Sequence, residues 1–283
     1  MTQDPLDIDH LRQWIGRTET AQDTVSPRLV AGYLAVLDDP QPQRDLGDLA
    51  PLAIHWCLAP ETRPMSQLGL DGHPKRGGLL PPVPLPHRMW AGGKIDLTGR
   101  FQVGDLITRK STVQDVTLKT GRSGSLCFVA VDHAFTGPQG LVLTERHDIV
   151  YRAPRDPNAP APVIPQAPVG RWSYSVMADP VLLFRYSALT FNGHRIHYDR
   201  NHAITSEGYT GLVVHGPLQA TMMLEFAAKL KDNPPTTFTF RGISPLIDGA
   251  AFTVNADETP EGLRLWTAAA DGRLCMEAQA VWA

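Results

Sequence analysis

The sequence lacks the features that mark secreted, membrane and nucleic-acid-binding proteins. Its first residues, MTQDPLDIDHLRQW, are acidic and contain no apolar core of the kind that a secretory signal requires. No stretch approaches the about 18 consecutive apolar residues of a membrane-spanning helix. The 283 residues carry a formal net charge of −3 and no basic stripe, which argues against nucleic acid as a partner. We therefore expect a cytoplasmic protein with no membrane segment.

Cysteine is also scarce. The chain has 3 cysteines, Cys57, Cys127 and Cys275, which are scattered and show no pair spacing. An odd, dispersed set of this kind predicts neither a disulfide framework nor a structural zinc site. We expect all three to be small buried hydrophobic residues.

Proline and glycine are abundant, with 25 and 24 residues, and they concentrate in two places. Residues 59–86 hold so many helix and strand breakers that they predict a long loop, of the kind that forms the lid or wall of a site. Residues 153–169 are rich in proline and predict a stiff, extended linker. The linker divides the chain into an N-terminal unit, 1–152, and a C-terminal unit, 170–283.

Each unit shows helical periodicity followed by alternating apolar residues. In the first unit the pattern predicts one helix and several strands, over 26–37 for the helix and over 52–57, 89–97, 106–118, 126–135 and 141–151 for the strands. In the second it predicts a strand from 171, a helix over 181–189, a helix from Gly216 to about 232, and strands over 236–244, 250–257, 263–270 and 274–282. A helix followed by an antiparallel meander indicates an α+β fold.

The polar residues that look most like chemistry lie between 184 and 224. His197 is a candidate general base, because an imidazole titrates near neutral pH. Asn192 can hold a water or a carbonyl without taking its proton, and His194 lies between these two. Gly216-Pro217 then begins a helix, whose free N–H groups and positive dipole end suit an oxygen that gains negative charge. The N–H of Gly216 is the best donor, because Pro217 has none.

Plainer interpretations of the same residues remain open. The helix at Gly216 can be an ordinary capped core helix, and the histidines can be ordinary hydrogen-bonded residues. The spacing of His194 and His197 also fits two metal ligands, but no third ligand follows at a typical spacing, so we expect no metal.

With these residues in view, the segment LTFNGHRIHYDR with GYTGLVVHGPLQATMM resembles the MaoC-like, or hydratase 2, branch of the hot-dog proteins. The family motif reads approximately Asp-x-Asn-Pro-x-His, followed later by His-Gly at the start of the central helix. Asn192 stands where the family has Asp, His194 where it has Asn and Arg195 where it has Pro, whereas His197 and His215-Gly216 match.

These departures resemble one sub-branch more closely, the 3-methylfumaryl-CoA (mesaconyl-C4-CoA) hydratase group, to which itaconyl-CoA hydratases are similar. The first half agrees through RPMSQLGLDGHPKRGGLLPPVPLPHRMWAGG, so the resemblance covers nearly the whole chain. It implies a double hot-dog fold, with two tandem units that each have a central helix wrapped by a curved antiparallel sheet. No sequence repeat between the halves supports this duplication independently.

The resemblance implies reversible addition of water to mesaconyl-C4-CoA or itaconyl-CoA, which gives citramalyl-CoA. His197 would be the principal acid/base, Asn192 would position water, His194 would orient water or thioester, and the Gly216 N–H would stabilise the oxyanion. A guanidinium would pair with the free carboxylate of the substrate. The candidate substrate-binding residues are Arg195, Arg185, Arg88, Trp90 and Gly92.

CoA would be part of the acyl-CoA thioester substrate, so no cofactor is expected, and relatives in this fold class make a homodimer the expected assembly. Because the family's Asp is missing, the identity of the true base is open. A fatty-acid type 3-hydroxyacyl-thioester dehydratase and a hot-dog acyl-CoA thioesterase remain alternatives, as does a non-catalytic acyl-binding module. A thioesterase would release free CoA thiol, whereas a hydratase would not.

Overall fold

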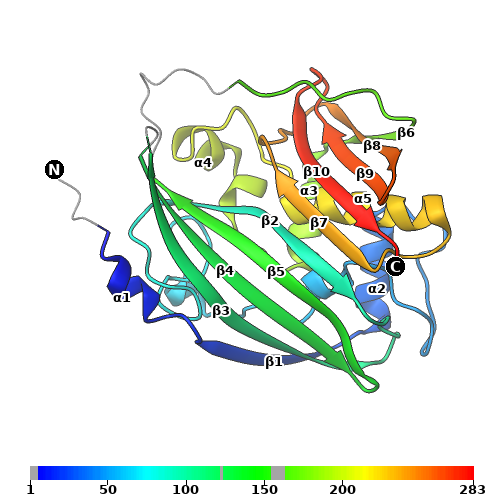
Figure 1. Cartoon of the computed structure of the whole chain (residues 1–283), viewed down its shortest axis with the longest axis horizontal. Coiled ribbons are helices and arrows are strands. Elements are labelled where there is room, and N and C mark those ends of the chain that lie inside the picture. The colour runs from blue at the N-terminus through cyan, green and yellow to red at the C-terminus, as the bar shows by residue number, and fades with distance from the viewer. Residues whose placement is uncertain (1–5, 122–123, 154–162) are drawn as a thin grey trace.

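The computed structural model describes residues 6–121, 124–153 and 163–283. Within them ten strands form one antiparallel sheet, in the order β1-β3-β4-β5-β2-β7-β10-β9-β8-β6 (Figure 1). The strands are β1 Thr18–Thr24, β2 His87–Leu97, β3 Leu106–Gly121, β4 Gly124–Gly137, β5 Gly140–Arg152, β6 Trp172–Met177, β7 Thr237–Gly242, β8 Ala251–Thr259, β9 Gly262–Ala268 and β10 Leu274–Val281. The helices are α1 Ile8–Arg12, α2 Pro27–Val36, α3 Pro180–Leu189, α4 Arg200–Thr205 and α5 Gly216–Lys231, with 3₁₀ turns η1 Ile54–Cys57, η2 Met65–Gln67 and η3 Arg195–His197.

The sheet shows an internal duplication that the sequence does not. The first five strands are ordered β1-β3-β4-β5-β2, and the last five, taken from the far edge, are ordered β6-β8-β9-β10-β7, which is the same topology. The equivalent strands β2 and β7 pair with each other, with Ile95 opposite Phe238, and so join the halves into one continuous sheet. Two tandem units with a shared sheet are therefore confirmed by strand order.

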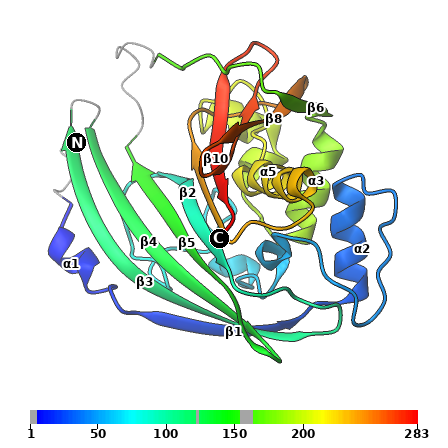
Figure 2. The ribbon, with the colours of Figure 1, turned by 45° about the vertical axis from the view of Figure 1, so that its right-hand side comes forward.

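Helix α5 is the central helix of the second half. Figure 2 shows it crossing one face of the sheet formed by β7 to β10, with α3 and α2 beyond it. Its buried apolar residues include Leu218, Met223 and Leu224. The hydroxyl of Tyr33 on α2 lies 3.0 Å from the Leu52 carbonyl oxygen and 3.2 Å from Oγ1 of Thr221 on α5. The core therefore continues from the first half into the second.

The expectation of a strand over 52–57 was wrong. Residues Ile54–Cys57 form a 3₁₀ turn, and Ala53 before it has a φ of 56°. A short buried apolar run reads the same as a strand or as a helical turn, because alternation cannot be seen when both faces are buried. The other predicted helices and strands are present, within a few residues of their expected bounds.

The predicted linker, 153–169, falls largely outside the described residues. Its last residues lie against the turn before β10, where the Ala167 N–H donates to the Gly272 carbonyl at 2.8 Å and the Leu274 N–H donates to the Pro165 carbonyl at 2.9 Å. This part of the linker therefore packs along the second half.

A buried carboxylate organises the inner side of β5. Glu145 is 2% exposed and receives the Trp56 indole N–H at 2.7 Å. His147 lies 2.7 Å from one of its oxygens and His55 lies 3.2 Å from the other. Burial acts to raise the pKa of Glu145, but the His147 and His55 imidazoles outweigh it and hold this pKa well below its usual range. The carboxylate therefore stays ionised inside the fold.

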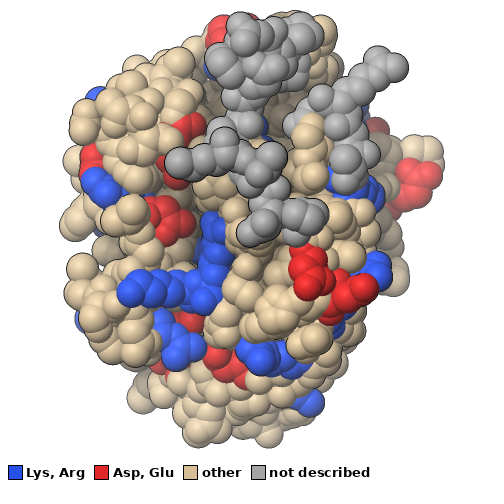
Figure 3. All heavy atoms as spheres, turned by 90° about the vertical axis from the view of Figure 1, so that its left-hand side faces the viewer, with Lys and Arg blue, Asp and Glu red and all other residues tan. Residues whose placement is uncertain are grey.

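Within the described residues, no helix combines the length and the apolar character needed to cross a membrane. On the face drawn in Figure 3, which is the left-hand side of Figure 1, Lys and Arg side chains gather near the middle, around an indentation of the surface. An indentation with this charge suits an anionic ligand.

Candidate active site

The polar segment begins where α3 ends. Phe191 follows the helix with a φ of 52°, and the Asn192 N–H donates back to the Ser187 carbonyl at 2.9 Å. The Asn192 side-chain oxygen then accepts the backbone N–H of His194 at 3.0 Å. Asn192 therefore shapes the turn that leads into η3, and its oxygen is already engaged.

His197 ends η3 with its ring held in one orientation. The side chain is buried, and Nδ1 lies 2.7 Å from the Val213 carbonyl oxygen. A carbonyl can only accept, so Nδ1 carries the proton and Nε2 keeps its lone pair. Burial lowers the pKa of His197 to about 4, although the bond to Val213 acts in the opposite direction. His197 is therefore a neutral imidazole at pH 7 and is able to accept a proton.

His215 connects His197 to the amino end of α5. It is the residue before the helix, it is fully buried, and its ring stacks on that of His197 with 3.6 Å between centroids. Its Nε2 lies 2.8 Å from Oγ of Ser187 on α3. The imidazole of His197 and the start of α5 therefore lie side by side.

Gly216 packs against an aromatic wall. A Cβ added to Gly216 would lie 2.8 Å from Cε3 of Trp90 on β2, so only glycine fits beneath the indole. As the first residue of α5, Gly216 has an N–H without an intrahelical partner, at the positive end of the helix dipole. Trp90 thus packs against Gly216, the residue that follows His215.

Gly92, the other predicted substrate-binding residue of this strand, faces protein backbone. A Cβ added there would lie 2.5 Å from the carbonyl oxygen of Phe240 on β7. The small residue is therefore required by close strand packing at the β2–β7 junction.

The long loop over 59–86 contacts the catalytic segment through backbone. A Cβ on Gly72, which has a φ of +88°, would lie 1.9 Å from the Gly193 carbonyl oxygen, so two glycine backbones are in direct contact. The Arg195 N–H donates to the Asp71 carbonyl at 2.9 Å, and its guanidinium donates to the Leu70 carbonyl at 3.0 Å. The tip of the loop is thereby fixed onto the segment between Asn192 and His197.

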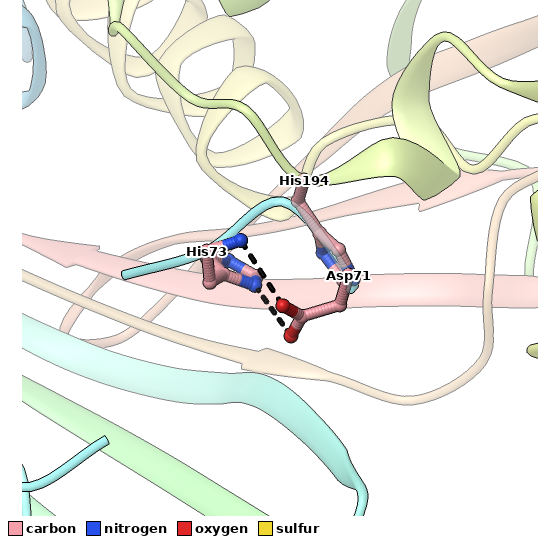
Figure 4. Close-up of side chains that lie close together, drawn as sticks. All are labelled: Asp71, His73 and His194. Atoms are coloured by element: carbon pink, nitrogen blue, oxygen red, sulfur yellow. Dashed lines mark hydrogen bonds and ion pairs between the residues drawn. The ribbon is translucent and has the colours of Figure 1, made fainter. Parts of the chain in front are cut away.

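This contact places Asp71 and His73 beside His194 (Figure 4). Asp71 accepts the backbone N–H of His73 at 3.1 Å, and its second oxygen lies 3.1 Å from His73 Nδ1. The His73 ring lies 4.1 Å from the His194 ring, which lies 5.5 Å from the His197 ring. Donor atoms of Asp71, His73 and His194 lie within 4.8 Å of one another, close enough to hold a cation.

The charges in this cluster are set by burial. Burial, reinforced by Arg88, lowers the pKa of His73 to about 4, against the effect of Asp71. Burial also lowers the pKa of His194, together with the nearby His73 and His197. The carboxyl pKa of Asp71 is lowered because the His73 contacts outweigh burial. At neutral pH the cluster therefore holds one carboxylate and neutral imidazoles.

The three predicted arginines occupy different environments. Arg195 is paired with Asp199 at 2.7 Å and with the loop carbonyl already described. Arg185 is exposed on the outer side of α3. Arg88, on β2, lies near enough to His73 and His194 to depress both of their pKa values, and no carboxylate of the described residues forms a salt bridge with it. Of the three predicted arginines, Arg88 is therefore the one that acts on the histidine cluster, together with Arg76 of the loop, which also lowers the pKa of His73.

Sequence reasoning did not select Asp71, His73 or Ser187 as site residues. The first two stand in the motif Asp-Gly-His within the proline-rich loop, which the sequence marked as a possible wall of a site and as part of the family resemblance, without singling out either side chain. Ser187 lies inside an ordinary amphipathic helix and gave no signal.

Comparison with known proteins identifies the family. Residues 53–248 match the family model described as hydroxyacyl-thioester dehydratase type 2. A mesaconyl-C(4)-CoA hydratase from Chloroflexus aurantiacus is 40% identical over 266 residues, which cover 94% of this chain and 95% of the relative. A mitochondrial hydroxyacyl-thioester dehydratase type 2 from Schizosaccharomyces pombe is 39% identical over 83 residues, 28% of each chain.

Solved structures support the fold. A MaoC-like dehydratase from Phytophthora capsici aligns with a TM-score of 0.70 at 15% identity and covers 98% of this chain and 99% of that one. A Mycobacterium tuberculosis protein described as a double hotdog fold aligns with a TM-score of 0.57 at 15% identity, over 98% of each chain. The predicted double hot-dog fold is thus confirmed. The chain belongs to the hydroxyacyl-thioester dehydratase type 2 family of MaoC-like proteins and is a hydro-lyase.

Proposed function

We propose that this hydro-lyase adds water reversibly to a C5 dicarboxylic enoyl-CoA, mesaconyl-C4-CoA or itaconyl-CoA, to give citramalyl-CoA. The observation that carries the proposal is the stacking of His197 on His215, which brings a proton-accepting Nε2 next to the amino end of α5. The mesaconyl-C(4)-CoA hydratase that is similar over 94% of this chain supports the substrate class.

In this mechanism the Nε2 of His197 takes a proton from water as the water oxygen bonds to the β-carbon of the enoyl thioester. The charge that develops on the thioester oxygen is stabilised by the Gly216 N–H and the dipole of α5. The proton then returns to the α-carbon, so that water is added and nothing else is consumed. Asn192 and His194 position water and thioester, and the Trp90 indole forms a wall beside Gly216.

The protein carries cationic groups that can pair with the negative charges of the substrate. Arg88 faces the histidine cluster and forms no salt bridge with a carboxylate of the described residues, so we assign it the free carboxylate of the substrate. Arg195 and Arg185 become the weaker candidates, because one is paired with Asp199 and the other is exposed on α3. The basic indentation in Figure 3 suits the phosphates of CoA.

The test is a panel of enoyl-CoAs that includes mesaconyl-C4-CoA, itaconyl-CoA and straight-chain monocarboxylic esters. We expect loss of enoyl absorbance and a mass gain of one water with the dicarboxylic esters, without free thiol. Turnover of only the straight-chain esters would favour the alternative, a fatty-acid type 3-hydroxyacyl-thioester dehydratase. The matching family model and the Schizosaccharomyces pombe relative carry the name hydroxyacyl-thioester dehydratase type 2. Thiol release without water addition would make the protein a thioesterase.

A further inference from the structure

The catalytic segment lacks the carboxylate that its family motif contains. Asn192 stands at that position, and its side-chain oxygen is already occupied by the backbone N–H of His194 at 3.0 Å. An amide can orient a group but cannot accept a proton or stabilise a cation as a carboxylate does. A carboxylate with this role would have to come from elsewhere in the chain.

The loop over 59–86 supplies such a carboxylate. Asp71 enters the site because the backbones of Gly72 and Gly193 are in contact and because Arg195 binds the carbonyls of Leu70 and Asp71. These docking contacts use backbone atoms of the loop, so they leave the Asp71 side chain available for another role. The carboxylate lies against His73, with 3.1 Å between Oδ2 and Nδ1 (Figure 4).

A carboxylate at Nδ1 fixes both the tautomer and the charge preference of an imidazole. It holds the Nδ1 proton, so that Nε2 is left to exchange a proton, and it stabilises the imidazolium when one forms. In the row of rings His73, His194 and His197, the centroids are 4.1 Å and 5.5 Å apart, and Asp71 faces the His73 end. A proton that reaches His73 is therefore stabilised by Asp71, which opposes the effects of burial and of Arg88 on this imidazole.

We propose that Asp71 and His73, supplied by the loop, replace the missing acid of the motif: His73 is a second catalytic acid/base and Asp71 is its positioning residue. This inference rests on the proposed function. The proton that water gives to His197 passes through His194 to His73, where Asp71 stabilises the cation, and His73 Nε2 then gives it to the α-carbon. One O–H bond of water breaks, one C–O and one C–H bond form, and all three imidazoles return to neutral.

Asp71→Asn tests the positioning role with little change in shape. Asparagine keeps an oxygen for the His73 backbone N–H, which Asp71 accepts at 3.1 Å, and keeps the carbonyl that Arg195 binds. We expect kcat for water addition to fall by about 100-fold with KM within about threefold, since a properly placed acid/base contributes this much to the chemical step. The control is Lys75→Met in the same loop, which removes the 2.9 Å bond to the Ser66 carbonyl and should leave kcat within about twofold.

His73→Ala tests the catalytic role through chemical rescue. We expect its kcat to fall as far as in Asp71→Asn and to recover at least about tenfold when imidazole is added, because a diffusible base can replace a missing one. A purely structural role would give no recovery. Unchanged kcat in Asp71→Asn, an equal loss in Lys75→Met, or no response to imidazole would each overturn the proposal.

The same donors are spaced to hold a metal, so wild-type protein should also be assayed for bound metal before and after chelation. The proposal expects full activity without metal. Stoichiometric metal whose removal abolishes activity would make Asp71 and His73 ligands and overturn the acid/base role. Wild-type protein that hydrates no enoyl-CoA would instead refute the proposed function, so the two failures are distinguishable.

Discussion

His197→Asn is expected to lower kcat for enoyl-CoA hydration by a factor of about 10² to 10⁴, the usual contribution of a general base. Asparagine can still donate to the Val213 carbonyl, which His197 Nδ1 contacts at 2.7 Å, so the variant should fold normally. Asparagine has no basic nitrogen to replace Nε2 of His197, so the variant cannot accept the proton of water. Steady-state kinetics, with circular dichroism and thermal melting to confirm folding, provide the measurement.

The pH dependence of the wild-type enzyme gives the same residue an independent test. Because the pKa of His197 is lowered to about 4, its neutral form persists through mildly acidic pH and is lost only as the pH falls through that value. We expect kcat/KM to change little between about pH 7 and 5.5, where an ordinary imidazole would lose about tenfold. Near-full activity in His197→Asn, or a steep acidic limb near about pH 6.5, would place the base elsewhere.

Glu145→Ala is expected to reduce the free energy of unfolding by about 3 kcal/mol or more, the cost of removing one partner from a buried ionic network. The change leaves the Trp56 indole N–H and the His147 and His55 rings without the carboxylate that now contacts all three. Urea unfolding at pH 7, followed by tryptophan fluorescence and circular dichroism, measures the loss as a shift of the midpoint.

Glu145→Gln is the matched variant, because it keeps the volume and one acceptor but loses the charge. The folded-state pKa of Glu145 lies below its unfolded value, so its contribution is fully present above about pH 4.5 and is lost as the pH falls through the lower folded value. The stability difference between wild type and Glu145→Gln should therefore shrink as the pH falls below that range. Equal stability of the three proteins at pH 7 would show that the network contributes nothing.

Much of the fold could be predicted from local pattern. Ser26 before Pro27 and Asp179 before Pro180 each cap a helix as expected, and both side chains accept a backbone N–H of the first turn. The prediction of a strand over 52–57 was wrong because burial on both sides removes the periodicity that distinguishes a strand from a helical turn. Strand β1, with the sequence TETAQDT, was missed because it is an edge strand without alternating apolar residues.

The site was predictable where its residues are close in sequence and not where they are joined by tertiary contact. His197 and Gly216 were chosen from spacing, and the structure places His197 against His215, immediately before Gly216. The position of Asp71 depends on a glycine–glycine backbone contact between segments far apart in the chain, which no local pattern encodes. The pairing of Arg195 with Asp199, by contrast, is local, because the two residues are four positions apart in the chain.

The most direct measurement is the structure of the protein with a non-reactive, saturated C5 dicarboxylic CoA analogue bound. We expect the thioester oxygen to lie within hydrogen-bond distance of the Gly216 N–H, with the β-carbon facing Nε2 of His197 and the carboxylate near Arg88. An analogue whose acyl group binds away from His197 and the amino end of α5 would contradict this expectation.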